Sequence, residues 1–202
     1  MKILFSPFSP FVRKCLITGL SLGLNERITL LPCSAHPINR DQDIIVSNPL
    51  GKVPTFFTDE GQVLYDSRVI CEYLNDLAHG SLIPATGLAR WETLTLQSLA
   101  DGMLDAAVLA RYEDAARPEA FRWAEWKAAQ LDKVETSLAA LNDDPQKLAD
   151  RVDIGTIAVG CALWYLDLRF ADLGWRERHP YVASWYAGYS QRPEMAATWS
   201  LD

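Results

Sequence analysis

The sequence has no apolar run of the ~20 residues that a helix needs to span a bilayer. Met1-Lys2 leads into a short strand pattern, without the apolar core and small-residue cleavage site of a signal peptide. The four cysteines are scattered, with no Cys-x-x-Cys pair and no paired cysteine and histidine spacing. A disulfide framework and a structural metal are therefore not expected. We expect a cytoplasmic protein without a metal cofactor, with His79 and His179 at its surface.

Positive charge is also scarce, since 19 Lys and Arg face 26 Asp and Glu, a net charge of −7. This balance argues against nucleic acid or an anionic membrane as the main partner. The charge is uneven, because residues 1–80 hold seven Lys and Arg against eight Asp and Glu. An anionic ligand would therefore meet less repulsion in the N-terminal part of the chain.

The first 80 residues alternate strand and helix patterns, which predicts a small α/β unit. Apolar residues recur at helical spacing in residues 10–23 and 67–77. Asp59-Glu60-Gly61 is a turn signal between the last two strand patterns and predicts an antiparallel hairpin. The predicted strands are Lys2 to Phe5, Arg27 to Leu31, Val53 to Phe57 and Gln62 to Tyr65.

Strand patterns stop at residues 79–84, which read as a linker, and only helical patterns follow. Residues 88–116 predict one long helix, and Pro118 predicts the start of the next. Asp153 is a good N-cap for a strongly apolar helix, but Thr156 stands where a capping box usually has Glu or Gln. We therefore expect the cap without the reciprocal carboxylate bond. The predicted domains are residues 1–80 and an all-helical domain of residues 86–202.

Residues 48–54, Asn-Pro-Leu-Gly-Lys-Val-Pro, lead directly into the apolar strand pattern Thr-Phe-Phe. A cis Val53-Pro54 bond is favoured here, since the tertiary amide of proline reduces the trans preference to roughly 0.5–1 kcal/mol. A cis bond would turn the backbone N–H and C=O of Val53 away from the sheet, where an extended ligand can pair with them. The alternative is that Pro54 only starts an edge strand.

Asp66-Ser67 follows at the start of the next helical pattern. Its carboxylate and hydroxyl would be placed for the ammonium and carboxylate of an amino acid, which together with Val53 suggests a small peptide ligand. Taken alone, the pair is typical of a helix N-cap.

Ser9 precedes Pro10 at the start of the first helical pattern. Proline suits the first helical position, so Ser9 is the predicted N-cap. A ligand thiol against Ser9 would meet a hydroxyl donor and the positive end of a helix, and both lower a thiol pKa. The alternatives are a cap alone, worth about 1 kcal/mol, or the neighbouring Ser6. Arg13 is expected to be structural.

In this order and at this spacing, these three segments resemble the glutathione site of the glutathione transferases, in a class with a serine-type active site. The resemblance covers the whole chain and implies a thioredoxin-like α/β N-terminal domain followed by an all-α C-terminal domain. It implies that Ser9 activates the thiol of glutathione and that Pro54 shapes the site. The implied glutathione-binding residues are Lys52, Val53, Asp66 and Ser67.

The resemblance also implies a homodimeric enzyme that conjugates glutathione, its co-substrate, to a hydrophobic electrophile. The serine at position 9 favours conjugation over mixed-disulfide exchange. Asp101 is expected to be an exposed carboxylate, or to reach the glutathione of the neighbouring subunit. A glutathione-binding carrier or interaction module with little catalysis and a glutathione-dependent disulfide reductase stay open. The predicted co-substrate pocket is formed by Phe8, Phe11, Met103, Ala107 and Arg111.

Overall fold

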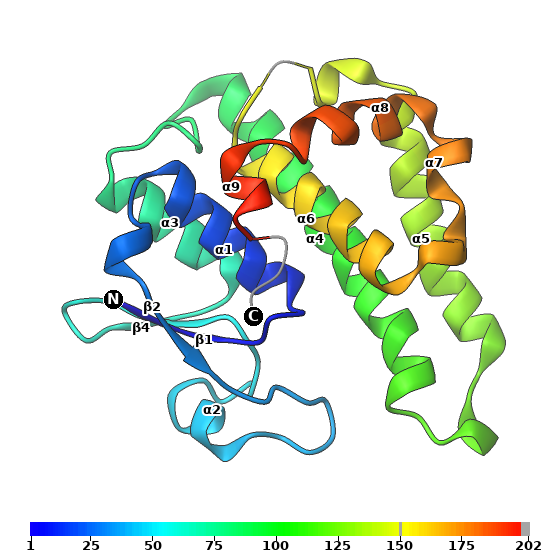
Figure 1. The fold of residues 1–202 in the computed structure, drawn as a ribbon, viewed down its shortest axis with the longest axis horizontal. Helices are drawn as coiled ribbons and strands as arrows, with labels where there is room; N and C mark the ends of the chain where they lie inside the picture. Colours follow the sequence, from blue (N-terminus) through cyan, green and yellow to red (C-terminus); the bar gives the residue numbers. More distant parts are fainter. Residues whose placement is uncertain (150, 199–202) are drawn as a thin grey trace. The chain divides into compact units, whose positions relative to one another are not determined.

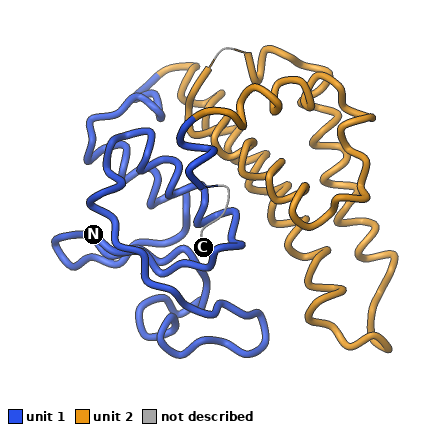
Figure 2. The backbone as a smooth tube through the Cα atoms, viewed as in Figure 1, with its two compact units in different colours: residues 1–86, 193–202 blue, residues 87–192 orange. Residues whose placement is uncertain are grey.

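The computed structural model describes residues 1–149 and 151–198. Contacts within the chain divide it into two compact units (Figure 2). Unit 1 combines residues 1–86 with the C-terminal segment that begins at Pro193, and unit 2 is Gly87–Arg192. The sequence suggested a helical domain that continues to the end of the chain, whereas the segment from Pro193 groups with the α/β unit.

Unit 1 is built on a four-stranded mixed sheet with the order β2-β1-β3-β4. β1 is parallel to β2, with Lys2 opposite Thr29, and antiparallel to β3. β3 and β4 are antiparallel, which confirms the predicted hairpin. The strands are β1 (Lys2–Phe5), β2 (Thr29–Pro32), β3 (Thr55–Phe57) and β4 (Val63–Leu64).

The register brings three chain segments to the same end of this sheet. β1 ends where β3 begins, because Leu4 lies opposite Thr55. β4 also ends there, because Leu64 lies opposite Phe56 and the two strands run in opposite directions. The residues that follow β1, precede β3 and follow β4 are therefore brought together at this end of the strands, which is called the sheet edge below.

Two helices of unit 1, α1 (Pro10–Ser21) and α3 (Ser67–Leu77), pack against each other. Each starts at the sheet edge just described. The helix α2 (Gln42–Ser47) was not predicted, because six residues are too few for a helical period to be recognised. Asp41 caps it by accepting a hydrogen bond from the backbone N–H of Asp43.

The short helix α9 (Pro193–Ala196) packs against α1 in unit 1. Arg13, fully buried on α1, donates hydrogen bonds to the carbonyl oxygens of Met195 (2.8 Å) and Thr198 (2.9 Å). These bonds attach the C-terminal segment to the α/β unit and give Arg13 the structural role predicted for it.

Unit 2 is entirely helical in its described residues. Its helices are α4 (Gly87–Ala115), α5 (Ala124–Asn142), α6 (Ile154–Arg169), α7 (Trp175–Arg178) and α8 (Pro180–Tyr189). A short 3₁₀ turn lies in each connection from α4 to α7, and only His179 separates α7 from α8. The long helix predicted over residues 88–116 is confirmed. The helix predicted from Pro118 begins only at Ala124, because Glu119–Phe121 form a 3₁₀ turn and the extended Trp123 donates its backbone N–H to Glu113 Oε1 at 2.7 Å.

α6 is the buried core helix of unit 2 and packs along α4 (Figure 1). Gly155 permits the close approach, since a Cβ at this position would lie 2.9 Å from Leu96 Cβ and from the carbonyl oxygen of Thr93. At its start, Asp153 Oδ1 accepts the Thr156 N–H (2.9 Å), and Thr156 Oγ1 accepts the Asp153 N–H (3.0 Å). The sequence correctly excluded a reciprocal bond to a carboxylate, but the capping box is still complete because the Thr156 hydroxyl accepts that bond instead.

Two expectations about surface residues are wrong. His179 is buried, and its Nε2 lies 3.0 Å from Glu135 Oε1, an acid 44 residues away in sequence. Asp101 is also buried, with 2% of its surface exposed.

In the described residues no single helix is long and apolar enough to cross a membrane, and only the pair α6 and Ala171–Arg178, bent by 98°, has that length and composition.

Candidate functional site

Ser9 stands at the sheet edge, between β1 and α1, and is the N-cap of α1. Its Oγ accepts a hydrogen bond from the Val12 N–H at 3.3 Å, and its own N–H donates to the Ser6 carbonyl at 3.0 Å. As an acceptor, the hydroxyl uses a lone pair and keeps its hydrogen for a second partner. The side chain is half-buried, and the first turn of α1 carries no acidic residue that would offset the positive helix end. Capping and donation to a ligand thiolate are therefore compatible at Ser9.

The Val53-Pro54 peptide bond is cis, as the sequence predicts. The turn before it is held by Asn48, which is 1% exposed. Asn48 Nδ2 donates to the Lys52 carbonyl (3.1 Å) and to Thr55 Oγ1 (3.0 Å), and Asn48 Oδ1 accepts the Leu50 N–H (3.1 Å). The Thr55 hydroxyl also donates to the Lys52 carbonyl, at 2.9 Å. Asn48 thus fixes the backbone on which Val53 sits.

The positioning role of Asn48 was missed from the sequence. We expect Asn48→Ala to lower the free energy of unfolding of unit 1 by about 1–3 kcal/mol, because it leaves the buried partners of the amide without hydrogen bonds. The resemblance to the glutathione transferases implies that glutathione affinity should fall too, because the backbone around Val53 would no longer be held in place. Urea unfolding and calorimetric titration measure the two effects. The exposed Asn39, replaced in the same way, is the matched control, and equal behaviour of the two variants would contradict this role.

Asp66 and Ser67 begin α3 at the same sheet edge. Asp66 Oδ1 accepts the Arg68 N–H at 2.9 Å, and Oδ2 forms an ion pair with the Arg68 guanidinium at 3.2 Å. Both side chains are 54% exposed, so this ion pair contributes little and its carboxylate can accept a further donor. Ser67 is buried in the first turn of this eleven-residue helix, where backbone N–H groups have no partner within the helix. Such a helix start favours a carboxylate beside a bound ammonium.

The remaining predicted site residues are divided between the units. In unit 1, Lys52 and Phe8 are exposed and Phe11 is half-buried. On α4 of unit 2, Met103 and Ala107 are buried and Arg111 is half-buried. Lys52 lies beside the turn that Asn48 organises, because its carbonyl accepts two of the bonds described above.

Cysteine 33 follows β2 at the same edge of the sheet and is the one thiol among the four that is not buried. Burial of its sulfur, followed by the negative charge of Asp41, raises the pKa of Cys33 to about 11. The Asp41 carboxylate stays ionised because hydrogen bonds from the backbone of Ser34 and Asp43 lower its pKa. Cys33 is therefore a neutral thiol at physiological pH and a poor nucleophile.

We expect Cys33 in the native protein to react slowly with iodoacetamide at pH 8, since only roughly one thiol in a thousand is ionised three units below its pKa. Asp41→Asn should accelerate the reaction, because loss of the negative charge lowers the Cys33 pKa while asparagine still caps α2. Mass spectrometry of the labelled peptide gives the rate, and Asp43→Asn is the matched control. Labelling at the rate of a free cysteine would contradict the raised pKa.

Comparison with known proteins identifies the family to which this fold belongs. The glutathione S-transferase N-terminal domain model matches residues 8–77, and the glutathione S-transferase C-terminal domain model matches residues 124–188. The uncharacterized GST-like protein YibF of Escherichia coli is 33% identical over 202 residues, 98% of each chain. The chain belongs to the glutathione S-transferase family.

Solved structures of this family share the fold. A glutathione transferase family member from Pseudomonas fluorescens Pf-5, crystallised with bound glutathione, superposes with a TM-score of 0.95 at 46% identity, covering 98% of this chain and 97% of that chain. A Methylobacillus flagellatus glutathione S-transferase with glutathione bound has a TM-score of 0.84 at 33% identity, with 98% of both chains covered. The fold is thus the glutathione transferase architecture, with a thioredoxin-like N-terminal domain and a helical C-terminal domain.

Among more distant relatives, elongation factor 1-gamma of Danio rerio is 27% identical over 162 residues, 78% of this chain and 36% of that protein. The similarity of this chain therefore extends to a protein that is not named as a transferase.

Proposed function

We propose that this protein is a glutathione transferase that binds glutathione at the sheet edge of unit 1 and promotes attack of its thiolate on a small electrophile. The observation that carries the proposal is the meeting of Ser9, Val53 and the start of α3 at one end of the sheet. Support comes from the Pseudomonas fluorescens relative, which has glutathione bound and shares 46% of its sequence with this chain.

In this proposal glutathione lies extended along the edge. The backbone of Val53 pairs with its cysteinyl part, as in the addition of a strand to a sheet. The Asp66 carboxylate accepts the γ-glutamyl ammonium, while Ser67 and the first N–H groups of α3 hold the γ-glutamyl carboxylate. Lys52, exposed beside the turn, is placed for the glycyl carboxylate.

The Ser9 hydroxyl donates to the sulfur, and the positive end of α1 adds to the stabilisation of its negative charge. The thiolate then supplies the nucleophile, so the protein contributes orientation and charge stabilisation instead of a covalent group of its own. The high pKa of Cys33 accords with this, because the cysteine at this edge is not a thiolate at neutral pH. We further propose a cytoplasmic homodimer that takes a hydrophobic electrophile as its second substrate.

A second candidate is a glutathione-binding protein with little catalysis. The relation to elongation factor 1-gamma favours it, because a shared fold does not fix an activity. Ser9 and Asp66 are compatible with it, since both also cap helices.

The test is a panel of purified protein with glutathione and an aryl halide, a peroxide or a small disulfide, together with calorimetric binding of glutathione. The proposal predicts glutathione binding and a rate well above background with the aryl halide. Binding with background rates for all three substrates would favour the second candidate, and a rate with the disulfide alone would indicate a reductase. Absence of glutathione binding would contradict both functions.

Asp66→Ala should weaken glutathione binding in the calorimetric titration roughly tenfold or more, since the charge-assisted bond to the γ-glutamyl ammonium is lost.

A further inference from the structure

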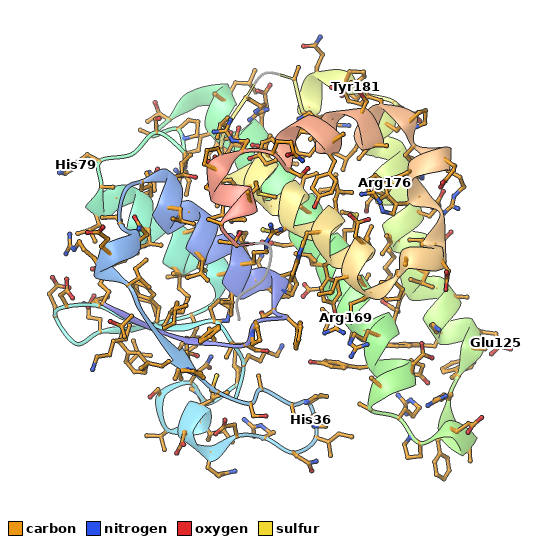
Figure 3. All side chains as sticks on the ribbon, in the orientation of Figure 1. His36, His79, Glu125, Arg169, Arg176 and Tyr181 are labelled. Carbon is orange, nitrogen blue, oxygen red and sulfur yellow. The ribbon has the colours of Figure 1, made fainter. Side chains whose placement is uncertain are left out.

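Two buried cysteines of unit 1 meet sulfur to sulfur between the helices α1 and α3. Cys15 on α1 is 1% exposed and Cys71 on α3 is fully buried, and their Sγ atoms are 3.9 Å apart. Both are thiols in the structure. The two helices lie side by side (Figures 1 and 3), although the cysteines are 56 residues apart in sequence. Their contact is therefore a product of the fold.

The sulfur pair is connected to the start of α3. The Cys15 thiol lies 3.9 Å from the carbonyl oxygen of Ser67, to which it can donate a weak hydrogen bond. The Thr18 hydroxyl lies 3.4 Å from Cys71 Sγ. Ser67 is in the first turn of α3, where its side chain and the helix N–H groups are proposed to hold the γ-glutamyl carboxylate. A change in the sulfur pair would therefore alter the backbone beside the proposed glutathione site.

Packing accounts for the burial of each cysteine, but the contact of the two sulfurs adds a chemical property. A buried cysteine by itself serves as a small hydrophobic side chain. Two thiols held in contact can also react with each other, because the fold replaces an encounter in solution by a step within one molecule. The sulfurs of a disulfide are about 2 Å apart, so rotation of the side chains and a small shift of the helices must close the remaining gap.

We propose that Cys15 and Cys71 form a reversible oxidation site, which a hydroperoxide converts into a disulfide and which glutathione reduces. Disulfides that form transiently in a reducing compartment are typically redox-sensing. The disulfide moves the Cys15 sulfur away from the Ser67 carbonyl and weakens glutathione binding. The oxidation site is independent of the proposed function, whereas its effect on glutathione rests on that function.

The chemistry balances with a hydroperoxide as the oxidant. A fluctuation of α1 or α3 admits the peroxide, the sulfur of one cysteine attacks an oxygen, and the O–O bond breaks, which leaves a sulfenic acid and releases water or an alcohol. The second sulfur then attacks the sulfenic sulfur, the S–S bond forms, and the hydroxyl leaves as water with the thiol proton. The two sulfurs together lose two electrons to the peroxide. In the reverse direction two glutathione molecules supply two electrons and leave as glutathione disulfide.

The first arm of the test detects the disulfide in the full-length wild-type protein. The native protein is treated with hydrogen peroxide at pH 8, unfolded in iodoacetamide and digested with trypsin without a reductant. Mass spectrometry should then find the peptide of Cys15 linked to the peptide of Cys71, and an excess of glutathione should return both to thiols. The assignment is unambiguous because trypsin places the four cysteines in four peptides, residues 15–27, 28–40, 69–90 and 152–169.

Cys33 is the internal reference of this arm, because it is the one cysteine that is not buried. The peroxide treatment is continued until the Cys33 peptide is fully oxidised. Cys15 and Cys71 that are still thiols at that point would overturn the inference. A link from either of them to Cys33 or Cys161 in place of the expected link would overturn it as well.

The second arm measures the effect on binding with S-methylglutathione, which has no thiol and leaves the disulfide intact. Calorimetric titration compares the reduced protein with the peroxide-treated protein. We expect the oxidised form to bind roughly threefold or more weakly, which is the size of change that the loss of one hydrogen bond produces. Equal affinity of the two forms would overturn the effect on binding. A reduced protein that does not bind S-methylglutathione would contradict the proposed function instead.

Variants show whether the disulfide itself causes the loss of affinity. Cys71→Ala cannot form it, so peroxide should leave its affinity for S-methylglutathione unchanged, whereas the matched control Cys33→Ala should lose affinity as the wild-type protein does. Loss of affinity in peroxide-treated Cys71→Ala would contradict the assignment. Circular dichroism follows the folding of each variant, and Cys15→Ala serves the same purpose if Cys71→Ala unfolds. If both unfold, the linked peptides decide, since they come from the wild-type protein.

Discussion

Replacing Asp153 by alanine is expected to lower the free energy of unfolding of unit 2 by about 3 kcal/mol. The carboxylate is nine-tenths buried and caps α6 by accepting the Thr156 N–H. It also accepts hydrogen bonds from the hydroxyl of Thr93 on α4 and from the guanidinium of Arg151 (2.6 Å). The substitution therefore removes the cap, a charge-assisted bond and a connection between the two central helices at once.

Urea unfolding followed by tryptophan fluorescence measures this effect, because six of the seven tryptophans lie within residues 87–192. Asp153→Asn separates the causes, since asparagine keeps a cap acceptor and loses the charge, and it should cost clearly less than the alanine. Thr156→Val removes the reciprocal bond together with the bond that the buried Tyr189 hydroxyl donates to Thr156 Oγ1 (3.2 Å), and should cost about 1–3 kcal/mol while leaving the Asp153 cap in place. A loss for Asp153→Ala no greater than that of an exposed residue would show that α6 does not depend on this cap.

Replacing Ser9 by alanine is expected to raise the pKa of glutathione bound to the enzyme by roughly one to two units, because a hydrogen bond to a charged group is worth about 1.5–3 kcal/mol. The conjugation rate at pH 7 should fall in proportion to the thiolate that is lost, and the rising limb of the pH–rate profile should move to higher pH. Affinity for glutathione should change little, since Val53, Asp66 and Ser67 are untouched.

The control for this experiment is Ser6→Ala, the neighbouring half-buried serine, whose carbonyl accepts the Ser9 N–H and remains in place. Loss of the helix cap in Ser9→Ala lowers the free energy of unfolding by about 1 kcal/mol in any case. A change in stability alone therefore cannot distinguish the helix-cap role of Ser9 from a role in stabilising the thiolate, whereas the pH–rate profile can. An unmoved profile in Ser9→Ala, or a shift only in Ser6→Ala, would remove Ser9 from the chemistry.

The features that could be predicted from the sequence depend on short-range chemistry. Helix caps at Ser9 and Asp153, the hairpin turn after β3 and the cis bond before Pro54 involve residues close together in the chain. The shift of the second strand from residues 27–31 to Thr29–Pro32 could not be predicted, because pairing with β1 sets its register and Asn25–Arg27 form a 3₁₀ turn.

The parts that were missed depend on contacts between distant residues or on the closing of a loop. The partners of Arg13 lie 182 and 185 residues further along the chain, and Glu135, the partner of His179, lies on α5. Asn48 could be recognised only as part of a turn, because its hydrogen bonds to Lys52 and Thr55 form only when the loop has folded.

The central claim is that the N-terminal unit binds glutathione and lowers the pKa of its thiol. The most direct measurement is the ultraviolet absorbance of the thiolate in the wild-type complex, titrated with pH at saturating protein and corrected for the free protein. The account predicts that bound glutathione ionises at a pH clearly below the ~8.5 of an unperturbed thiol. A titration curve that coincides with that of free glutathione, in a complex shown by calorimetry to be saturated, would contradict it.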